Sequence, residues 1–174
     1  ICIGAATIGH DGKLLCATGK GHGDAIHLTD LCPDRPGLEV MMPHEEKEGG
    51  YGWDVHDATT GEFLCVAMGD RDNGRGLAAD FVPANRGFEF WSSTDADVRD
   101  CATGNTVIAG KKPDTNFRIY WTGDPYDQTF DGRYSTTTGG YSPRIQNYNT
   151  ARKSIVTFQN FYEYGNPSAC NTTK

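Results

Sequence analysis

A short pattern that occurs twice, 50 residues apart, limits most strongly what this chain can fold into. The pattern combines an aspartate, a proline, a glycine and a glutamate, and its two copies are Asp30-x-x-Pro33-x-x-x-Gly37-x-Glu39 and Asp80-x-x-Pro83-x-x-x-Gly87-x-Glu89. All four positions recur at the same offset. Such a repeat is typical of stacked supersecondary units, for example propeller blades or solenoid turns.

Glycine and proline interrupt the apolar residues so often that short strands are favoured over long helices. The chain has 174 residues, of which 37% are hydrophobic, with 22 glycines and 8 prolines. We therefore expect an all-β fold built from β-propeller blades of about 50 residues. Residues 1–174 then form part of one β-propeller domain, with roughly three and a half blades and an incomplete ring. Because Ile1 begins in the middle of a strand-like pattern, we also expect a piece of a longer chain.

The turn chemistry gives a coarse map of the strands. Two β-hairpins are expected, with turns at Asp11-Gly12 and at 57–61, and a related turn at 100–104. The segment 21–37 is expected to be a loop, and no amphipathic helix is expected. The expected strands are 4–10, 13–18, 38–42, 52–56, 62–67, 77–81, 88–92, 117–121 and 156–161.

Charge and cysteine content narrow the class of protein. A net charge of −7, from 23 acidic and 16 basic residues, disfavours nucleic acid as a partner. No apolar run approaches the ~20 residues of a membrane helix, so no membrane partner is expected. The six cysteines suit either an oxidising compartment with disulfides or small buried side chains, and both interpretations stay open here.

The densest set of possible metal ligands lies just before and after the first copy of the repeat. Carboxylates mixed with an imidazole on loops between strands suit a hard cation, chiefly Ca²⁺. The alternative is that Asp24 and Asp30 only cap tight turns. The acids of the repeat are expected to be turn clamps or structural calcium ligands, since a catalytic residue would not need to recur in each blade. The densest set of possible ligands consists of His22, Asp24, His27, Asp30, His44, Glu45 and Glu46.

Arg75 lies between two glycines, Gly74 and Gly76, which permit a close approach of the backbone. An arginine in such a loop can clamp a carboxylate, although a solvated loop arginine is the simpler interpretation. The tryptophans Trp53, Trp91 and Trp121 all fall on expected strands, where a core position is more usual than stacking on a sugar.

The ordered series of motifs resembles one family. GHGDAIHLTDLCPDRPGLEV, followed by HEE, DATTGEFL, GRGLAADF and GFEFWSS, is similar to the rhamnogalacturonan lyases of polysaccharide lyase family 11. The resemblance runs from about Asp11 to Trp121 and resumes at Asn171-Thr172-Thr173-Lys174. It implies a secreted, eight-bladed, calcium-binding β-propeller that cleaves the rhamnose–galacturonate backbone of pectin by β-elimination. The implied partners are the pectic polysaccharide rhamnogalacturonan I and the remaining blades of the propeller.

The resemblance also implies roles for individual positions. His22, Asp24 and Glu45 match the residues that hold a calcium ion in the central cleft. Arg75, Asn171 and Lys174 match cleft residues that act in substrate binding or catalysis. The repeated acids match blade-loop acids, some of which bind structural calcium: Asp30, Glu39, Asp80 and Glu89.

The expected chemistry needs a base and a way to neutralise a carboxylate. Removal of the C5 proton of a galacturonate spreads charge into its carboxylate, which a calcium ion and Arg75 would stabilise. The base is expected to be Lys174 or a histidine, for which His44 is the candidate. The rival interpretation is a non-catalytic, calcium-clamped propeller that serves as a carbohydrate-binding or adhesion module.

Overall fold

The computed structural model describes residues 5–47, 50–135, 140–149 and 154–158, and its fold is all-β. Within these ranges there is no helix long and apolar enough to cross a membrane. The strands are β1 (Thr7–Ile8), β2 (Leu14–Cys16), β3 (His27–Thr29), β4 (Glu39–His44), β5 (Gly52–Asp57), β6 (Phe63–Met68), β7 (Gly76–Ala79), β8 (Glu89–Ser92), β9 (Val98–Asp100), β10 (Thr106–Ile108), β11 (Phe117–Ile119), β12 (Gln128–Ser135), β13 (Gly140–Gln146) and β14 (Ser154–Thr157).

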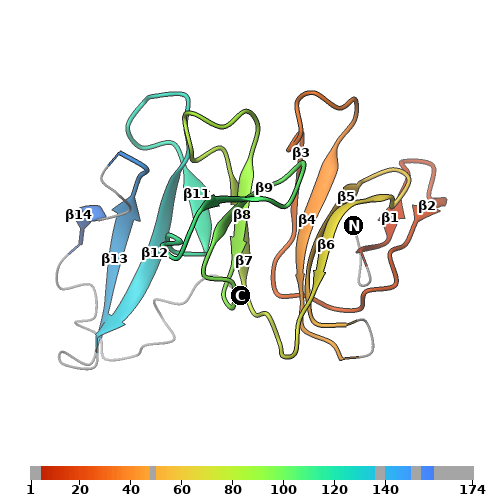
Figure 1. Cartoon of the computed structure of the whole chain (residues 1–174), viewed down its shortest axis with the longest axis horizontal. Coiled ribbons are helices and arrows are strands. Elements are labelled where there is room, and N and C mark those ends of the chain that lie inside the picture. The colour runs from red at the N-terminus through yellow and green to blue at the C-terminus, as the bar shows by residue number, and fades with distance from the viewer. Residues whose placement is uncertain (1–4, 48–49, 136–139, 150–153, 159–174) are drawn as a thin grey trace.

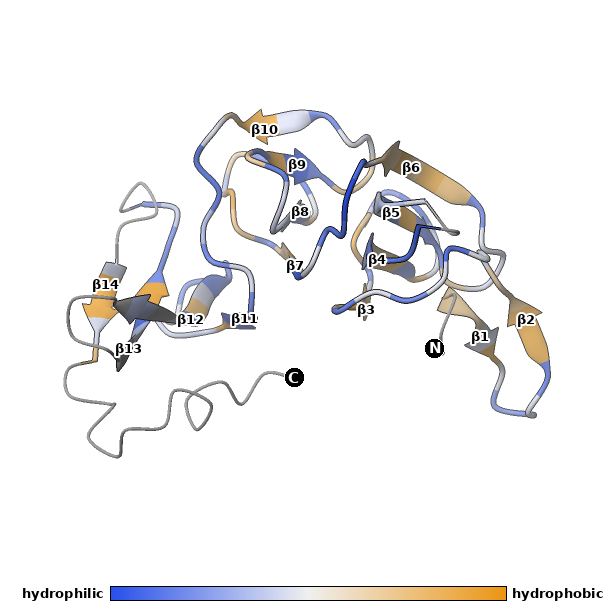
Figure 2. Ribbon diagram, turned by 90° about the horizontal axis from the view of Figure 1, so that it is seen from below, coloured by the Kyte–Doolittle hydropathy of each residue, from blue (hydrophilic) through white to orange (hydrophobic). Residues whose placement is uncertain are grey.

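The strands form four antiparallel sheets in which sequence neighbours pair. β1 and β2 make a two-stranded hairpin. The other three sheets have four strands each, in simple meander order. The first of them contains β3 to β6, the second β7 to β10 and the third β11 to β14. The three four-stranded sheets stand side by side (Figure 1). Seen from below, they follow an arc, with β3, β7 and β11 on its inner side (Figure 2). β7 contacts both β4 and β11, so it links the three sheets.

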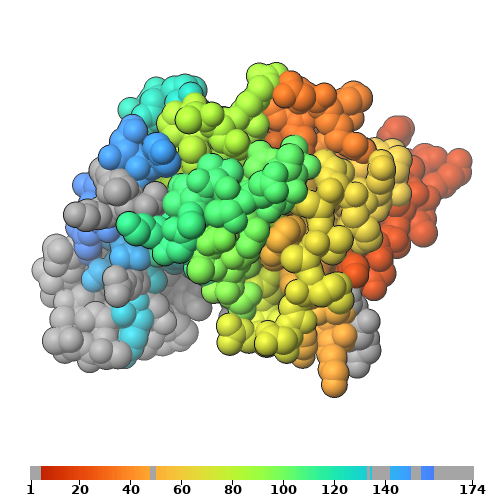
Figure 3. All heavy atoms as spheres, in the orientation of Figure 1, coloured from red at the N-terminus to blue at the C-terminus, as the bar shows by residue number. Residues whose placement is uncertain are grey.

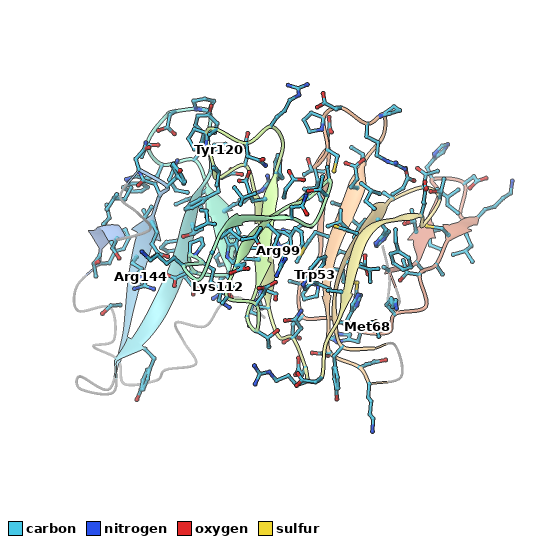
Figure 4. All side chains as sticks on the ribbon, viewed as in Figure 1. Trp53, Met68, Arg99, Lys112, Tyr120 and Arg144 are labelled. Carbon is cyan, nitrogen blue, oxygen red and sulfur yellow. The ribbon has the colours of Figure 1, made fainter. Side chains whose placement is uncertain are left out.

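The core lies between neighbouring sheets, where four strands are buried along their whole length. Every residue of β4, β5, β7 and β8 is buried. Between the first and second sheets, Trp53 packs edge-on against Phe90 with ring centroids 4.5 Å apart. The Arg99 guanidinium lies 5.6 Å from the Trp53 ring, at the boundary visible in Figure 4. Trp91 and Phe81 pack in a second cluster with Leu77. The space-filling view shows the first and second sheets abutting directly (Figure 3).

The repeated pattern is explained by one turn that joins the first two strands of a sheet. In the β3–β4 turn, Arg35 N–H donates to the Cys32 carbonyl at 2.8 Å, which places Pro33 at the second position of a β-turn. The β7–β8 turn repeats this with Asn85 and Val82 at 2.9 Å. The repeated glycines both have positive φ, 115° at Gly37 and 93° at Gly87, which a side chain would strain.

The repeated glutamates clamp these turns. Glu39 Oε2 accepts hydrogen bonds from the backbone N–H groups of Leu31 and Cys32, at 3.0 and 3.1 Å. Glu89 Oε2 accepts from Phe81 and Val82 at 3.0 and 2.8 Å. Both glutamates are fully buried. Of the two interpretations offered by the sequence, this geometry supports the turn clamp.

The expected strands agree with β1, β2, β4 to β8, β11 and β14 to within a few residues, and both expected hairpins are confirmed. The 57–61 turn closes through Asp57 Oδ1, which accepts from Thr59 and Thr60 N–H at 2.9 and 2.8 Å. The expected turn at 100–104 is confirmed, since it joins β9 to β10, but the expected strands left out β3, β9, β10, β12 and β13. β3 lies within the segment that was expected to be only a loop.

The cysteines within the described residues are free. Cys16, Cys32, Cys65 and Cys101 form no disulfide, while Cys2 and Cys170 lie outside the described residues. Burial raises the pKa of Cys32 and of Cys65 to about 12. These thiols act as small core side chains rather than as a disulfide framework.

Candidate functional site

The loops at the two ends of the sheets carry different kinds of residues. The clamped β3–β4 and β7–β8 turns lie at the upper end of Figure 1. The β2–β3, β4–β5 and β6–β7 connections lie at the lower end, and they carry the candidate site residues. The repeated scaffold and the unrepeated residues are therefore at opposite ends of the molecule.

Gly23 lets the β2–β3 loop cross directly over the end of β4. A Cβ atom at this position would lie 1.9 Å from the Pro43 carbonyl oxygen, a distance that no side chain tolerates. The Glu45 N–H also donates to the His22 carbonyl at 3.1 Å. This close approach brings the side chains before and after Gly23 up to Glu45.

His22, Asp24 and Glu45 form a cluster of possible metal ligands. One ligand atom from each lies within 4.8 Å of the others. The His22 Nδ1 and the Glu45 Oε1 are in direct contact. Two ligands that each lie about 2.4 Å from one calcium ion can be at most about 4.8 Å apart, so the spacing fits a single ion of that size. One imidazole with two carboxylates is a donor set that a hard cation accepts.

Arg75 is held by a buried asparagine two residues earlier. Asn73 is 1% exposed; its N–H donates to the His44 carbonyl at 3.0 Å, and its Oδ1 accepts from the Ser92 hydroxyl at 2.8 Å. The backbone of Arg75 then pairs with Ser93, which donates its N–H to the Arg75 carbonyl at 2.7 Å. These contacts tie the arginine loop to the end of β4 and to the end of β8.

A pocket of about 320 Å³ is lined both by Asp24 of the cation cluster and by Arg75. It draws residues from the first sheet, from the loop before β7 and from the loop before β11. The Oδ1 atom of Asn116 is buried there without a hydrogen-bond partner among the described residues. The lining residues are Gly23, Asp24, Ala25, Ile26, His27, Arg75 and Asn116.

His44 does not line this pocket. Its side chain is 1% exposed, and its Nε2 lies 2.7 Å from Oδ2 of the buried Asp54, without the angles of a hydrogen bond. Asp54 Oδ1 contacts His56 Nδ1 at 2.5 Å. Burial tends to raise the pKa of Asp54, but the two histidines together hold it below its usual value. A side chain this deep does not reach a polysaccharide, so the geometry places His44 behind the site.

The repeated aspartates lie at the opposite end of the sheets. Asp30 and Asp80 line one open pocket between the two clamped turns. The Asp80 N–H donates to Oδ2 of Asp127 at 2.8 Å, and the Asp127 N–H donates to the Asp80 carbonyl at 2.7 Å. Burial raises the pKa of both carboxyl groups, and the Asp127 charge adds to the rise at Asp80.

The structure thus brings some predicted site residues together and separates others. His22, Asp24 and Glu45 form one cluster, and Asp24 of this cluster lines one pocket together with Arg75. Among the described residues, the cation cluster does not include His27, Asp30, His44 or Glu46. Asn171 and Lys174 lie outside the described residues. Sequence reasoning did not find Asn116, since nothing in its local sequence marks it.

Comparison with known proteins assigns the chain to a family. Residues 1–174 match the family described as rhamnogalacturonan lyase family 11, C-terminal domain. The rhamnogalacturonan endolyase YesW of Bacillus subtilis (strain 168) is 42% identical over 131 residues, which cover 75% of this chain and 21% of that protein. The rhamnogalacturonan exolyase YesX of the same organism is 35% identical over 163 residues, covering 90% of this chain and 26% of that protein.

Solved structures of rhamnogalacturonan lyases also resemble this chain. The rhamnogalacturonan lyase PL11 of Bacillus licheniformis superimposes with a TM-score of 0.73 at 35% identity, covering 88% of this chain and 24% of that one. The exotype lyase YesX superimposes with a TM-score of 0.77 at 34% identity. The chain spans about a quarter of the length of these relatives. The chain belongs to rhamnogalacturonan lyase family 11.

Proposed function

We propose that these residues form part of a calcium-dependent rhamnogalacturonan lyase that cleaves the rhamnose–galacturonate backbone by β-elimination. The observation that carries this proposal is the pocket that Arg75 shares with Asp24, a member of the cation cluster. Two relatives named as rhamnogalacturonan lyases, one an endolyase and one an exolyase, support the substrate class. A polymeric substrate of this kind lies outside cells, and we therefore propose a secreted protein.

The ligand set fits calcium. His22, Asp24 and Glu45 would hold the ion, and a bound calcium ion would supply positive charge beside the substrate carboxylate. Asp24 belongs both to this cluster and to the pocket, so the ion would face the bound uronate. The Arg75 guanidinium would bind the carboxylate through two parallel N–H groups. Together these charges stabilise the carbanion that forms when the C5 proton leaves.

We further propose that the three four-stranded sheets are blades of a β-propeller. Their meander order, their arrangement along an arc and the inner position of each first strand are all typical of propeller blades (Figure 2). The β1–β2 hairpin would belong to a neighbouring blade. Other blades of the same ring would then be the structural partners of this chain.

A binding module that lacks catalysis is the rival function. The buried position of His44 favours it, because that side chain supplies no base to the pocket. The gathering of Arg75 with the cation cluster favours the lyase, since a scaffold needs only the turn clamps.

The two functions differ in their product. The natural protein that contains these 174 residues would be incubated with rhamnogalacturonan I, and absorbance of the unsaturated uronide would be followed in the ultraviolet. A lyase produces that absorbance, and a calcium chelator abolishes it. Binding of the polymer without any absorbing product would refute the lyase and support the binding module.

A further inference from the structure

We propose that His27 is the general base of this site, acting through its Nδ1 atom. The inference rests on the proposed lyase function, which requires a group that takes the C5 proton of a galacturonate. Among the described residues that line the pocket, His27 is the histidine, and it lies beside Asp24 and Arg75.

One hydrogen bond fixes which nitrogen of His27 carries the proton. Nε2 lies 3.0 Å from the Gly76 carbonyl oxygen, which can only accept. The neutral ring therefore keeps its hydrogen on Nε2 and presents a lone pair on Nδ1. His27 lines the pocket and its Nε2 is engaged with the backbone, so Nδ1 is the ring nitrogen left to act on a substrate there.

The surroundings keep the ring neutral. Burial lowers the pKa of His27, and the positive charges of Arg118 on β11 and Arg75 lower it further, against the opposing effect of the Gly76 carbonyl. Asp24 is the acidic group that lines the same pocket. A neutral imidazole at neutral pH is the form that a general base requires.

Nδ1 takes the proton from C5, and the electrons of the C5–H bond form the C4=C5 double bond. The C4–O bond breaks, and its electron pair leaves with the oxygen of the rhamnose unit, which takes a proton from water. Arg75 holds the carboxylate during this change. The resulting imidazolium keeps its Nε2–H bond to Gly76 and later returns the Nδ1 proton to solvent.

His27→Gln tests the base separately from the hydrogen bond, because the glutamine amide can still donate to the Gly76 carbonyl. In the natural protein, turnover of rhamnogalacturonan I is expected to fall by about 100-fold or more, with KM little changed. Wild-type turnover is expected to fall on the acid side below the ordinary pKa of a histidine. The matched control is His10→Gln, an exposed histidine in the β1–β2 turn, which is expected to keep wild-type turnover.

Chemical rescue provides the second readout. Added imidazole should restore part of the turnover of His27→Ala, an effect that a purely structural role would not give. Wild-type turnover in His27→Gln would overturn the assignment and leave the lyase intact. A wild-type protein that releases no unsaturated product would overturn both the lyase and the assignment.

Discussion

Gln128 makes in the third sheet the same pair of contacts that Glu89 makes in the second. Its Oε1 accepts from the backbone N–H groups of Trp121 and Thr122, at 2.6 and 3.1 Å. Glu89 accepts from Phe81 and Val82 in the equivalent turn. The clamp therefore occurs three times along the described chain and does not depend on a charge. Its constant element is a buried side-chain oxygen that satisfies two N–H groups.

Removal of this oxygen is expected to destabilise the fold. Glu39→Ala leaves two buried N–H groups without an acceptor, and each unsatisfied donor costs about 1–3 kcal/mol. The midpoint of urea unfolding should fall accordingly. The matched control is Glu62→Ala, whose exposed carboxylate pairs with Arg35 at 3.1 Å and is expected to contribute less than about 1 kcal/mol. Equal midpoints for the two variants would contradict the clamp.

Glu89 is expected to make stability depend on pH. Burial, with a smaller effect of the Asp80 charge, raises the pKa of Glu89 from 4.5 to about 7, although three hydrogen bonds oppose the rise. The folded protein therefore binds more protons than the unfolded chain within this window. The free energy of unfolding should decrease as the pH rises from about 4.5 to about 7, by roughly 3 kcal/mol in total.

Glu89→Gln should remove this contribution, because an amide oxygen makes the same clamp at Gln128 and does not titrate. Urea unfolding at a series of pH values measures the difference between the variant and the wild type. As the pH rises, the free energy of unfolding of Glu89→Gln is expected to increase relative to that of the wild type. A difference that stays constant from pH 4.5 to pH 8 would show that Glu89 does not titrate in this range.

The sequence predicted the repeated turn because each of its repeated spacings has a local physical cause, from the proline turn to the positive φ of Gly37. It did not reveal β12 and β13, since these strands contain Gly132 and Pro143 and few apolar residues. The third clamp was hidden because glutamine replaces glutamate. At the site, the ligand trio could be found because its members lie close together in the sequence, between His22 and Glu45, whereas the proximity of Asn116 comes from packing between sheets.

Gly23→Ala is expected to disperse the cation cluster, because its Cβ would collide with the Pro43 carbonyl. The calcium concentration that gives half-maximal lyase activity should rise at least tenfold, by about 1.4 kcal/mol or more. The matched control is Gly19→Ala in the same loop, where φ is 69° but no atom lies within 4 Å of the added Cβ. A Gly23→Ala protein with the calcium requirement of the wild type would place the functional cation elsewhere.

Arg75→Lys is expected to impair catalysis while keeping the positive charge. Lysine lacks the planar pair of N–H groups that can hold both oxygens of a carboxylate. Since Asn73 and Ser93 fix the loop through backbone and asparagine contacts, the substitution should leave the loop in place. We expect kcat/KM on rhamnogalacturonan I to fall by about 10-fold to 100-fold, a loss of about 1.4 to 2.7 kcal/mol. Arg71→Lys, at an exposed position of the same loop, is the control and should behave as the wild type. If both variants keep full activity, carboxylate binding does not depend on Arg75, and the pocket that it lines is not where the uronate is held.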